Sequence, residues 1–259
     1  MNKILIQNPR IINEGRSFIG SVLVEGDKIA AVFVPVMIAL AAVLVRIVPT
    51  PKEERNLDQL LLVFTNLAFM GIPIIQALYG VEGVAMLSMF LLVFNFLVFT
   101  YGVMLLDGSG DINLRQLVNP GVISALIALF FGLTGWRLPD PVESALASIG
   151  SINTPMAMMI IGASLAAFTN PRLYRVSFLR LIVMPLVFIG LALVMPINRM
   201  LAGLCVIVAA MPIAGNCSML SDIYTPEDMT ASHATIVSTL ISGVTLPLLV
   251  LVMTMVGLG

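Results

Sequence analysis

The sequence predicts an all-α integral membrane protein, and three observations support this. Hydrophobic residues make up 59% of the 259 residues, and charged residues make up only 10%, whereas charged residues form about 25% of a typical soluble domain. The mean hydropathy is +1.06. The apolar residues are also grouped into long stretches joined by short loops such as 49–59 and 107–116, none of which could hold a soluble domain.

Eight apolar segments have the length of a membrane-crossing helix, which is about 19 residues. They run approximately from 30 to 48, 60 to 79, 84 to 106, 117 to 134, 143 to 168, 176 to 197, 200 to 223 and 231 to 257. We therefore expect about eight transmembrane helices and a multi-pass location in the inner (plasma) membrane.

The basic residues in the loops orient the predicted helices, because cytoplasmic loops are enriched in Lys and Arg. One side carries Arg46, Lys52, Arg55, Arg115, Arg172, Arg175 and Arg180. The other side carries Arg137 and Arg199. We expect the first side to be cytoplasmic, although Lys3, Arg10, Arg16 and Lys28 before the first span run against this assignment.

Two of the apolar segments are interrupted by polar and helix-breaking residues. These are Asn66, Gly71 and Pro73 in the segment 60–79, and Pro212, Gly215 and Asn216 in the segment 200–224. A broken helix is tolerated in a bilayer only where protein or a water-filled cavity satisfies the freed backbone groups. One break in each half of the chain is typical of a secondary transporter.

The two broken segments also belong to an internal repeat. A shift of 145 residues superimposes Tyr79-Gly80-Val81-Glu82-Gly83 on Tyr224-Thr225-Pro226-Glu227-Asp228. The broken segments are the second and the seventh of eight, so each repeat has five spans and the second repeat enters the membrane from the opposite side. This predicts a five-plus-five inverted-repeat fold with two discontinuous, crossed helices. Residues 33–106 would be the remainder of the first repeat, without its first two spans, and residues 117–257 the second repeat.

The first 32 residues have a different character. Residues 3–32 show the alternation and turn residues of short β-strands, and they resemble the N-terminal strands of an amidohydrolase, most closely a dihydroorotase. The chain has a single histidine, His233, so it lacks the metal ligands of such an enzyme. We interpret this segment as a fusion at the gene or assembly level, and a cytosolic β-hairpin appendage is the alternative.

Four stretches of the chain have a distinctive combination of residues. They are Asn66-x-x-x-x-Gly71-Ile72-Pro73, the run from Asn153-Thr154-Pro155 to Gly162-Ala163-Ser164-Leu165-Ala166, Ala209-Ala210-Met211-Pro212 with Asn216, and Ser238-Thr239-Leu240 with Pro247. On these stretches the chain resembles, from about residue 33 to 257, a bacterial member of the auxin efflux carrier family. The resemblance implies a scaffold part and a transport part with crossed, discontinuous helices. It also implies a carboxylate as substrate, because bacterial relatives are associated with malate and malonate.

The residues at the two breaks form the predicted substrate site. Helix N-termini attract carboxylates, Asn amides donate and accept hydrogen bonds, Gly permits close backbone approach and Pro holds a break open. The predicted substrate-binding residues are Asn66, Gly71, Pro73, Pro212, Gly215, Asn216, Asn153 and Thr154. Asn95 is a further residue that could line the cavity, although such residues more often bond neighbouring helices.

Asp222 is the candidate ion-coupling residue, for a proton or sodium, although an ordinary interfacial carboxylate is the simpler interpretation.

We predict a permease for small organic anions such as malate, not an enzyme, with no cofactor and no metal site. The net charge of −1 provides no positive electrostatic potential to attract nucleic acid, so we do not expect nucleic-acid binding. The alternative is a truncated, transport-incompetent membrane protein with a binding or regulatory role. Partners are the substrate and the lipid bilayer, and a homodimer is left open.

Overall fold

The computed structural model shows a predominantly helical membrane protein. It describes residues 4–6, 10–13, 16–19, 22–24, 26–107, 123–124, 126–127, 130–131, 136, 138–152, 170–195, 198–225 and 228–258. The helices are α1 (Gly26–Ile47), α2 (Arg55–Val63), α3 (Ile72–Asp107), α6 (Asp140–Ser151), α8 (Pro171–Phe178), α9 (Met184–Val194), α10 (Arg199–Ala210), α11 (Gly215–Tyr224) and α12 (Thr230–Met255), with the short turns η1 (Lys52–Glu54), η2 (Leu67–Gly71) and η3 (Leu179–Val183). The predicted all-α membrane fold is confirmed.

The first residues form strands, as the sequence pattern predicted. They are β1 (Ile4–Ile6), β2 (Arg10–Asn13), β3 (Arg16–Ile19) and β4 (Val22–Val24). β1 pairs antiparallel with β4, and β2 pairs antiparallel with β3. Residues 26–32 differ from the expectation, because they are the first residues of α1. Gly26 and Asp27 therefore begin a helix instead of forming a turn between strands.

Several described helices can cross a membrane. Those long and apolar enough are Leu67–Ser88, Pro171–Val194 and Thr230–Met255, and shorter apolar helices are Phe33–Ile47, Val93–Asp107 and Arg199–Ala210. The total of eight spans stays a prediction, because most of 117–134 and of 143–168 lies outside the described residues.

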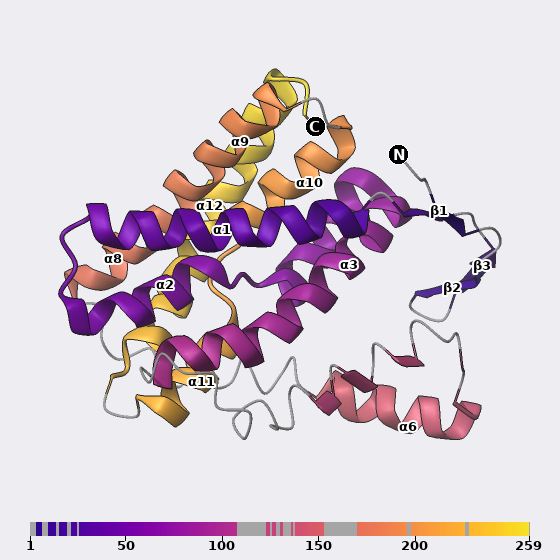
Figure 1. The fold of residues 1–259 in the computed structure, drawn as a ribbon. Coiled ribbons are helices and arrows are strands. Elements are labelled where there is room, and N and C mark those ends of the chain that lie inside the picture. The colour runs from indigo at the N-terminus through magenta and orange to yellow at the C-terminus, as the bar shows by residue number, and fades with distance from the viewer. Residues whose placement is uncertain are drawn as a thin grey trace.

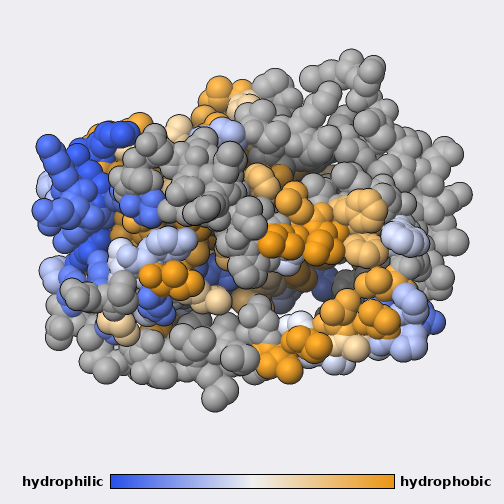
Figure 2. All heavy atoms as spheres, turned by 60° about the horizontal axis from the view of Figure 1, so that its bottom comes forward, coloured by the Kyte–Doolittle hydropathy of each residue, from blue (hydrophilic) through white to orange (hydrophobic). Residues whose placement is uncertain are grey.

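The surface fits a lipid environment. Leu240, Val244, Leu248 and Leu251 follow one another at helical spacing along α12, and each is more than half exposed. Figure 2 shows hydrophilic residues gathered at one end of the molecule, on the side where Figure 1 places α8 and the start of α2. A hydrophobic stripe with a polar end is the distribution that a bilayer requires.

The core of the protein is built around α10 and α2. Every residue of α10 from Leu201 to Ala210 is buried, and so is α2 from Leu57 onward. Figure 1 shows α1 crossing in front of the other helices, where it packs against α2 and α3. The ring of Phe33 in α1 contacts Phe90 of α3 and Phe188 of α9, at centroid distances of 5.4 and 4.6 Å.

Residue Gly80 divides α3 into two helical pieces. Its φ of 62° and ψ of −153° are non-helical, and this left-handed conformation favours glycine. The residue directly before it, Tyr79, donates its hydroxyl to the Leu258 carbonyl at 2.7 Å. The chain therefore kinks directly after Tyr79, and the hydrogen bond from Tyr79 links the end of the first broken span to Leu258, just after α12.

Gly203 in α10 makes this contact possible, because a Cβ at that position would overlap both the Tyr79 hydroxyl and the Leu258 carbonyl. We expect Gly203→Ala to destabilise the fold by about 1–3 kcal/mol, the usual cost of overpacking, and to lower the thermal unfolding midpoint in detergent. The matched control is Gly190→Ala in α9, where an added Cβ meets no atom within 4 Å. Equal midpoints for the two variants would contradict the prediction.

Candidate functional site

The two broken spans cross at their breaks. The Asn66 N–H donates to the Pro212 carbonyl at 2.8 Å, and the Ala214 N–H donates to the Phe64 carbonyl at 3.1 Å. These bonds enclose an isolated antiparallel bridge between Thr65 and Ile213. Each break therefore supplies partners for backbone groups of the other, as a hydrocarbon environment requires, and the predicted pair of crossed, discontinuous helices is confirmed.

Both spans resume as helices directly after the crossing. Asn66 caps η2, because its Oδ1 accepts the Phe69 N–H at 3.3 Å. The opposite helix α11 begins at Gly215 after Ala214, and no side chain caps it. Helix N-termini carry unpaired N–H groups and a partial positive charge. Two such ends therefore lie at the crossing.

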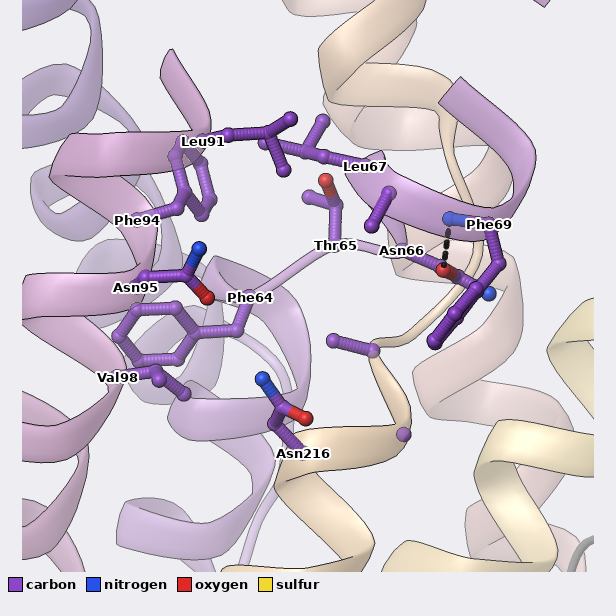
Figure 3. Close-up of a pocket in the computed structure, with 13 residues that line it drawn as sticks. Phe64, Thr65, Asn66, Leu67, Phe69, Leu91, Phe94, Asn95, Val98 and Asn216 are labelled. Carbon is purple, nitrogen blue, oxygen red and sulfur yellow. Dashed lines mark hydrogen bonds between the residues drawn. The ribbon is translucent and has the colours of Figure 1, made fainter. Parts of the chain in front are cut away.

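A cavity of about 50 Å³ opens at these two helix starts, which is room for a few water molecules. Its lining residues are Phe64, Thr65, Asn66, Leu67, Ala68, Phe69, Leu91, Phe94, Asn95, Val98, Ala214, Gly215 and Asn216. Figure 3 shows Asn95 of α3 and Asn216 of α11 on either side of the Phe64 ring, with the Asn66 amide turned toward Phe69. The walls are mostly apolar, with a few polar groups among them.

Thr65 supplies a polar group that the sequence reasoning missed. Its side chain is 5% exposed and lines the cavity, and its Oγ1 has no hydrogen-bond partner among the described residues. A buried hydroxyl without a partner costs about 1–3 kcal/mol. Such a group next to a cavity is available to a ligand. The signal in the sequence was its position directly before Asn66 in the break.

The structure brings some of the predicted substrate residues together and leaves others apart. Asn66, Gly215 and Asn216 line the cavity. Pro212 lies at the crossing, where it gives its carbonyl to the Asn66 N–H. Gly71 is buried in η2 and does not line the cavity, since a Cβ there would first meet Leu87 at 3.6 Å. Asn153 and Thr154 lie outside the described residues.

Pro73 does not hold the first break open, contrary to the expectation. The chain leaves the helix at Phe64, which has extended backbone angles, and Pro73 lies exposed in α3 beyond η2. Proline removes one helical hydrogen bond, and here the π-helical turn η2 ends at Gly71, two residues before Pro73. Asp222 lies exposed in the last turn of α11, away from the cavity lining. Ion coupling at Asp222 would therefore act at the end of the helix.

Arg180 is the main departure from the sequence reasoning, which counted it as a loop residue. It lies in the π-helical turn η3 and is 0% exposed. Its guanidinium donates to the carbonyls of Leu62 at 2.6 Å, Met211 at 3.0 Å and Val208 at 3.3 Å. The signal was present, because Arg180 falls inside the apolar segment 176–197, and a charged residue within a membrane span marks a functional site by default.

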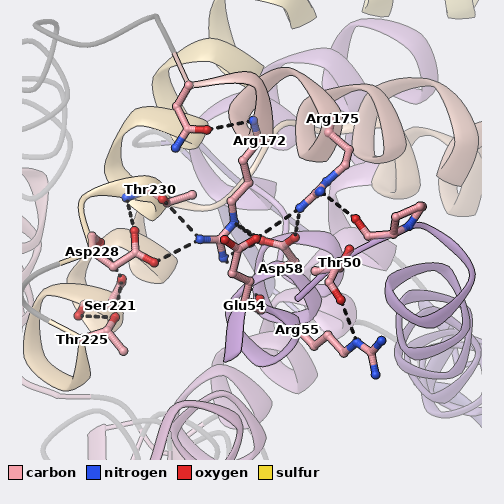
Figure 4. A network of polar contacts seen from close by, with 12 residues as sticks. Thr50, Glu54, Arg55, Asp58, Arg172, Arg175, Ser221, Thr225, Asp228 and Thr230 are labelled. Atoms are coloured by element: carbon pink, nitrogen blue, oxygen red, sulfur yellow. Dashed lines mark hydrogen bonds and ion pairs between the residues drawn. The ribbon is translucent and has the colours of Figure 1, made fainter. Parts of the chain in front are cut away.

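A second cluster of charges joins α2 to α8 and to the residues before α12 (Figure 4). Asp58 is 2% exposed, and its two oxygens accept from Arg172 at 2.8 Å and from Arg175 at 3.0 Å. Arg172 also pairs with Asp228 at 3.2 Å and with Glu54 at 3.3 Å. Glu54 and Asp58 lie at the start of α2, so the cluster fixes this end of the first broken span.

The pKa values of Asp58 and Asp228 in this cluster shift in opposite directions. Burial raises the pKa of Asp58, and the guanidinium groups of Arg172 and Arg175 oppose this shift. Burial also acts to raise the pKa of Asp228, but hydrogen bonds from Thr230 and the charge of Arg172 outweigh it and hold that pKa below its usual range. The charged form of Asp228 is therefore favoured where it pairs with Arg172.

Metal-ligating side chains do not cluster in the described part of the chain. No group of three or more His, Cys, Asp or Glu residues there could hold a metal ion. Cys205 and Cys217 are both buried free thiols.

The fold and the crossing define a membrane transport protein built on two broken helices. The profile of the family described as "Membrane transport protein" matches residues 27–114 and 109–250. The chain belongs to this family, which confirms the assignment to the auxin efflux carrier type made from the sequence motifs. The match begins after the strands β1 to β4. A search of curated proteins found no match.

The charge cluster leads to a stability prediction. Asp58→Asn keeps the shape of the side chain but leaves Arg172 buried without its nearest carboxylate. We expect a loss of about 1.5–3 kcal/mol, the usual contribution of a hydrogen bond to a charged group, while Arg172 keeps its pairs with Asp228 and Glu54. The measurement is thermal unfolding in detergent. Glu53→Gln is the matched control, since Glu53 is exposed on η1. The same midpoint for both variants would mean that the cluster does not hold α2 in place.

Proposed function

We propose that this chain is a multi-pass secondary carrier of the inner (plasma) membrane that transports small organic anions such as malate by alternating access around the crossing. It moves its substrate without converting it, so we take it to be a carrier and not an enzyme. The main support is the buried Thr65 hydroxyl, which lies without a partner among the described residues in the same cavity as two helix N-termini.

The chemistry of the cavity suits a carboxylate. The starts of η2 and α11 both face it, and each contributes about half a positive charge from its peptide dipoles. Asn216 and Asn95 add amide donors, and the Thr65 hydroxyl adds another. No acidic side chain lines the cavity among the described residues. A carboxylate would therefore meet donors and no competing negative charge.

The size of the cavity supports a mechanism with moving parts. A volume of about 50 Å³ holds a few waters, which is less than a dicarboxylate with several heavy atoms needs. Both ends of the first broken span are fastened, at Asp58 by ion pairs and at Tyr79 by the bond to Leu258. In the proposed cycle these two fastenings open alternately, and the cavity widens toward one side of the membrane at a time.

The proposal is tested by uptake of labelled malate into proteoliposomes that contain the purified chain. We expect uptake along an imposed malate gradient, above that of empty vesicles. No uptake, with no binding of malate to the protein in detergent, would contradict the proposed function and favour the alternative of a membrane protein with a binding or regulatory role for another ligand.

Thr65→Val separates function from folding. The substitution keeps the shape of the side chain and removes a hydroxyl that has no described partner, so the thermal midpoint should stay the same or rise slightly. Malate affinity should fall by about 10-fold or more, because a hydrogen bond to a charged group contributes about 1.5–3 kcal/mol. The control is Thr100→Val, whose hydroxyl donates to the Phe96 carbonyl. Unchanged malate affinity in Thr65→Val would remove Thr65 from the site.

A further inference from the structure

Arg180 binds the C-terminal ends of both helices that lead into the crossing. Leu62 lies in the last turn of α2 and Val208 in the last turn of α10, and Met211 is the residue after α10. The carbonyls of all three accept hydrogen bonds from the one guanidinium. The last four carbonyls of a helix have no partner within the helix, so Arg180 satisfies groups that the two breaks leave free.

The charges at this position balance. Each helix C-terminus carries about half a negative charge, so two ends together amount to about one, and Arg180 supplies one positive charge. Arg180 has no ion pair with an acidic side chain in the described parts of the chain. The carbonyl ends are thus compensated by the guanidinium, while the positive N-terminal ends of η2 and α11 stay directed at the cavity.

Converging carbonyls of broken helices are also the groups that hold a coupling cation in many secondary carriers. In this chain a protein side chain already occupies them. Arginine suits the position, because its planar group offers five donors in a fixed arrangement and stays charged. Lysine would bring the same charge on a compact ammonium with three donors.

We propose that Arg180 is a built-in counter-cation of the crossing, which takes the place of an inorganic cation at the carbonyl ends, so that the site binds its organic anion without sodium or potassium. The inference rests on the proposed function for the identity of the anion. The proposal that Arg180 compensates the carbonyl ends rests on the hydrogen bonds of Arg180 and does not depend on which anion binds.

The first experiment measures malate uptake by the purified chain in buffers of equal ionic strength that contain sodium, potassium or N-methylglucamine. We expect initial rates within about twofold of one another, because Arg180 already provides the charge. A rate that rises 10-fold or more with sodium or potassium would overturn the proposal.

The second experiment removes the side chain and supplies its charge from solution. Arg180→Ala should lower malate affinity by about 10-fold or more, and guanidinium at low millimolar concentration should restore at least part of it. Arg180→Lys should retain more affinity than Arg180→Ala. The matched control is Arg46→Ala, which removes an exposed arginine whose guanidinium donates to the Ala42 carbonyl, away from the crossing. Full malate affinity in Arg180→Ala without guanidinium would overturn the proposal.

The third experiment needs no substrate and therefore separates this proposal from the proposed function. Arg180→Ala should unfold at a lower temperature in detergent than the wild type, and low millimolar guanidinium should raise its midpoint but not that of the wild type or of Arg46→Ala. This rescue would support the counter-cation even if malate proved not to be the substrate. A midpoint of Arg180→Ala that guanidinium does not change would contradict it.

Discussion

The arrangement of this protein depends on one exchange of backbone hydrogen bonds, in which each broken span completes the other. Phe64 and Asn66 of the first break bond to Ala214 and Pro212 of the second. In hydrocarbon, unpaired N–H and C=O groups at these positions would each cost several kcal/mol. Neither break is therefore stable alone, and the two halves of the chain are held together where the polar cavity forms.

The same exchange arranges the charges of the site. The spans cross antiparallel, so the C-terminal ends of α2 and α10 meet at Arg180, and the N-terminal ends of η2 and α11 meet at the cavity. The partial negative charge of the C-terminal ends is compensated by the buried Arg180, and the partial positive charge of the N-terminal ends is left uncompensated at the cavity. Ion pairs at Asp58 and the bond from Tyr79 then hold the two ends of the first broken span.

The sequence predicted the membrane fold, the two breaks and their crossing, because hydropathy and the Asn, Gly and Pro residues report on backbone groups that a bilayer cannot leave unpaired. It did not predict which of those residues face the cavity. Pro73 lies past the break and Gly71 packs within the core, since the exact end of a helix depends on tertiary hydrogen bonds. Arg180 was missed because a count of charges by loop treats a buried arginine as a surface residue. Thr65 was missed because its position before Asn66 does not show that its hydroxyl lacks a hydrogen-bond partner.

The crossing itself is tested most directly by a cysteine pair at positions 65 and 213. The bonds on either side make Thr65 and Ile213 a non-hydrogen-bonded antiparallel pair, whose Cα atoms lie about 4.5 Å apart, within the range of a disulfide. In a background without Cys205 and Cys217, the account predicts that Thr65→Cys with Ile213→Cys loses both free thiols on mild oxidation of the membrane-embedded protein, while each single variant keeps one. Two thiols that stay reactive under the same conditions would contradict it.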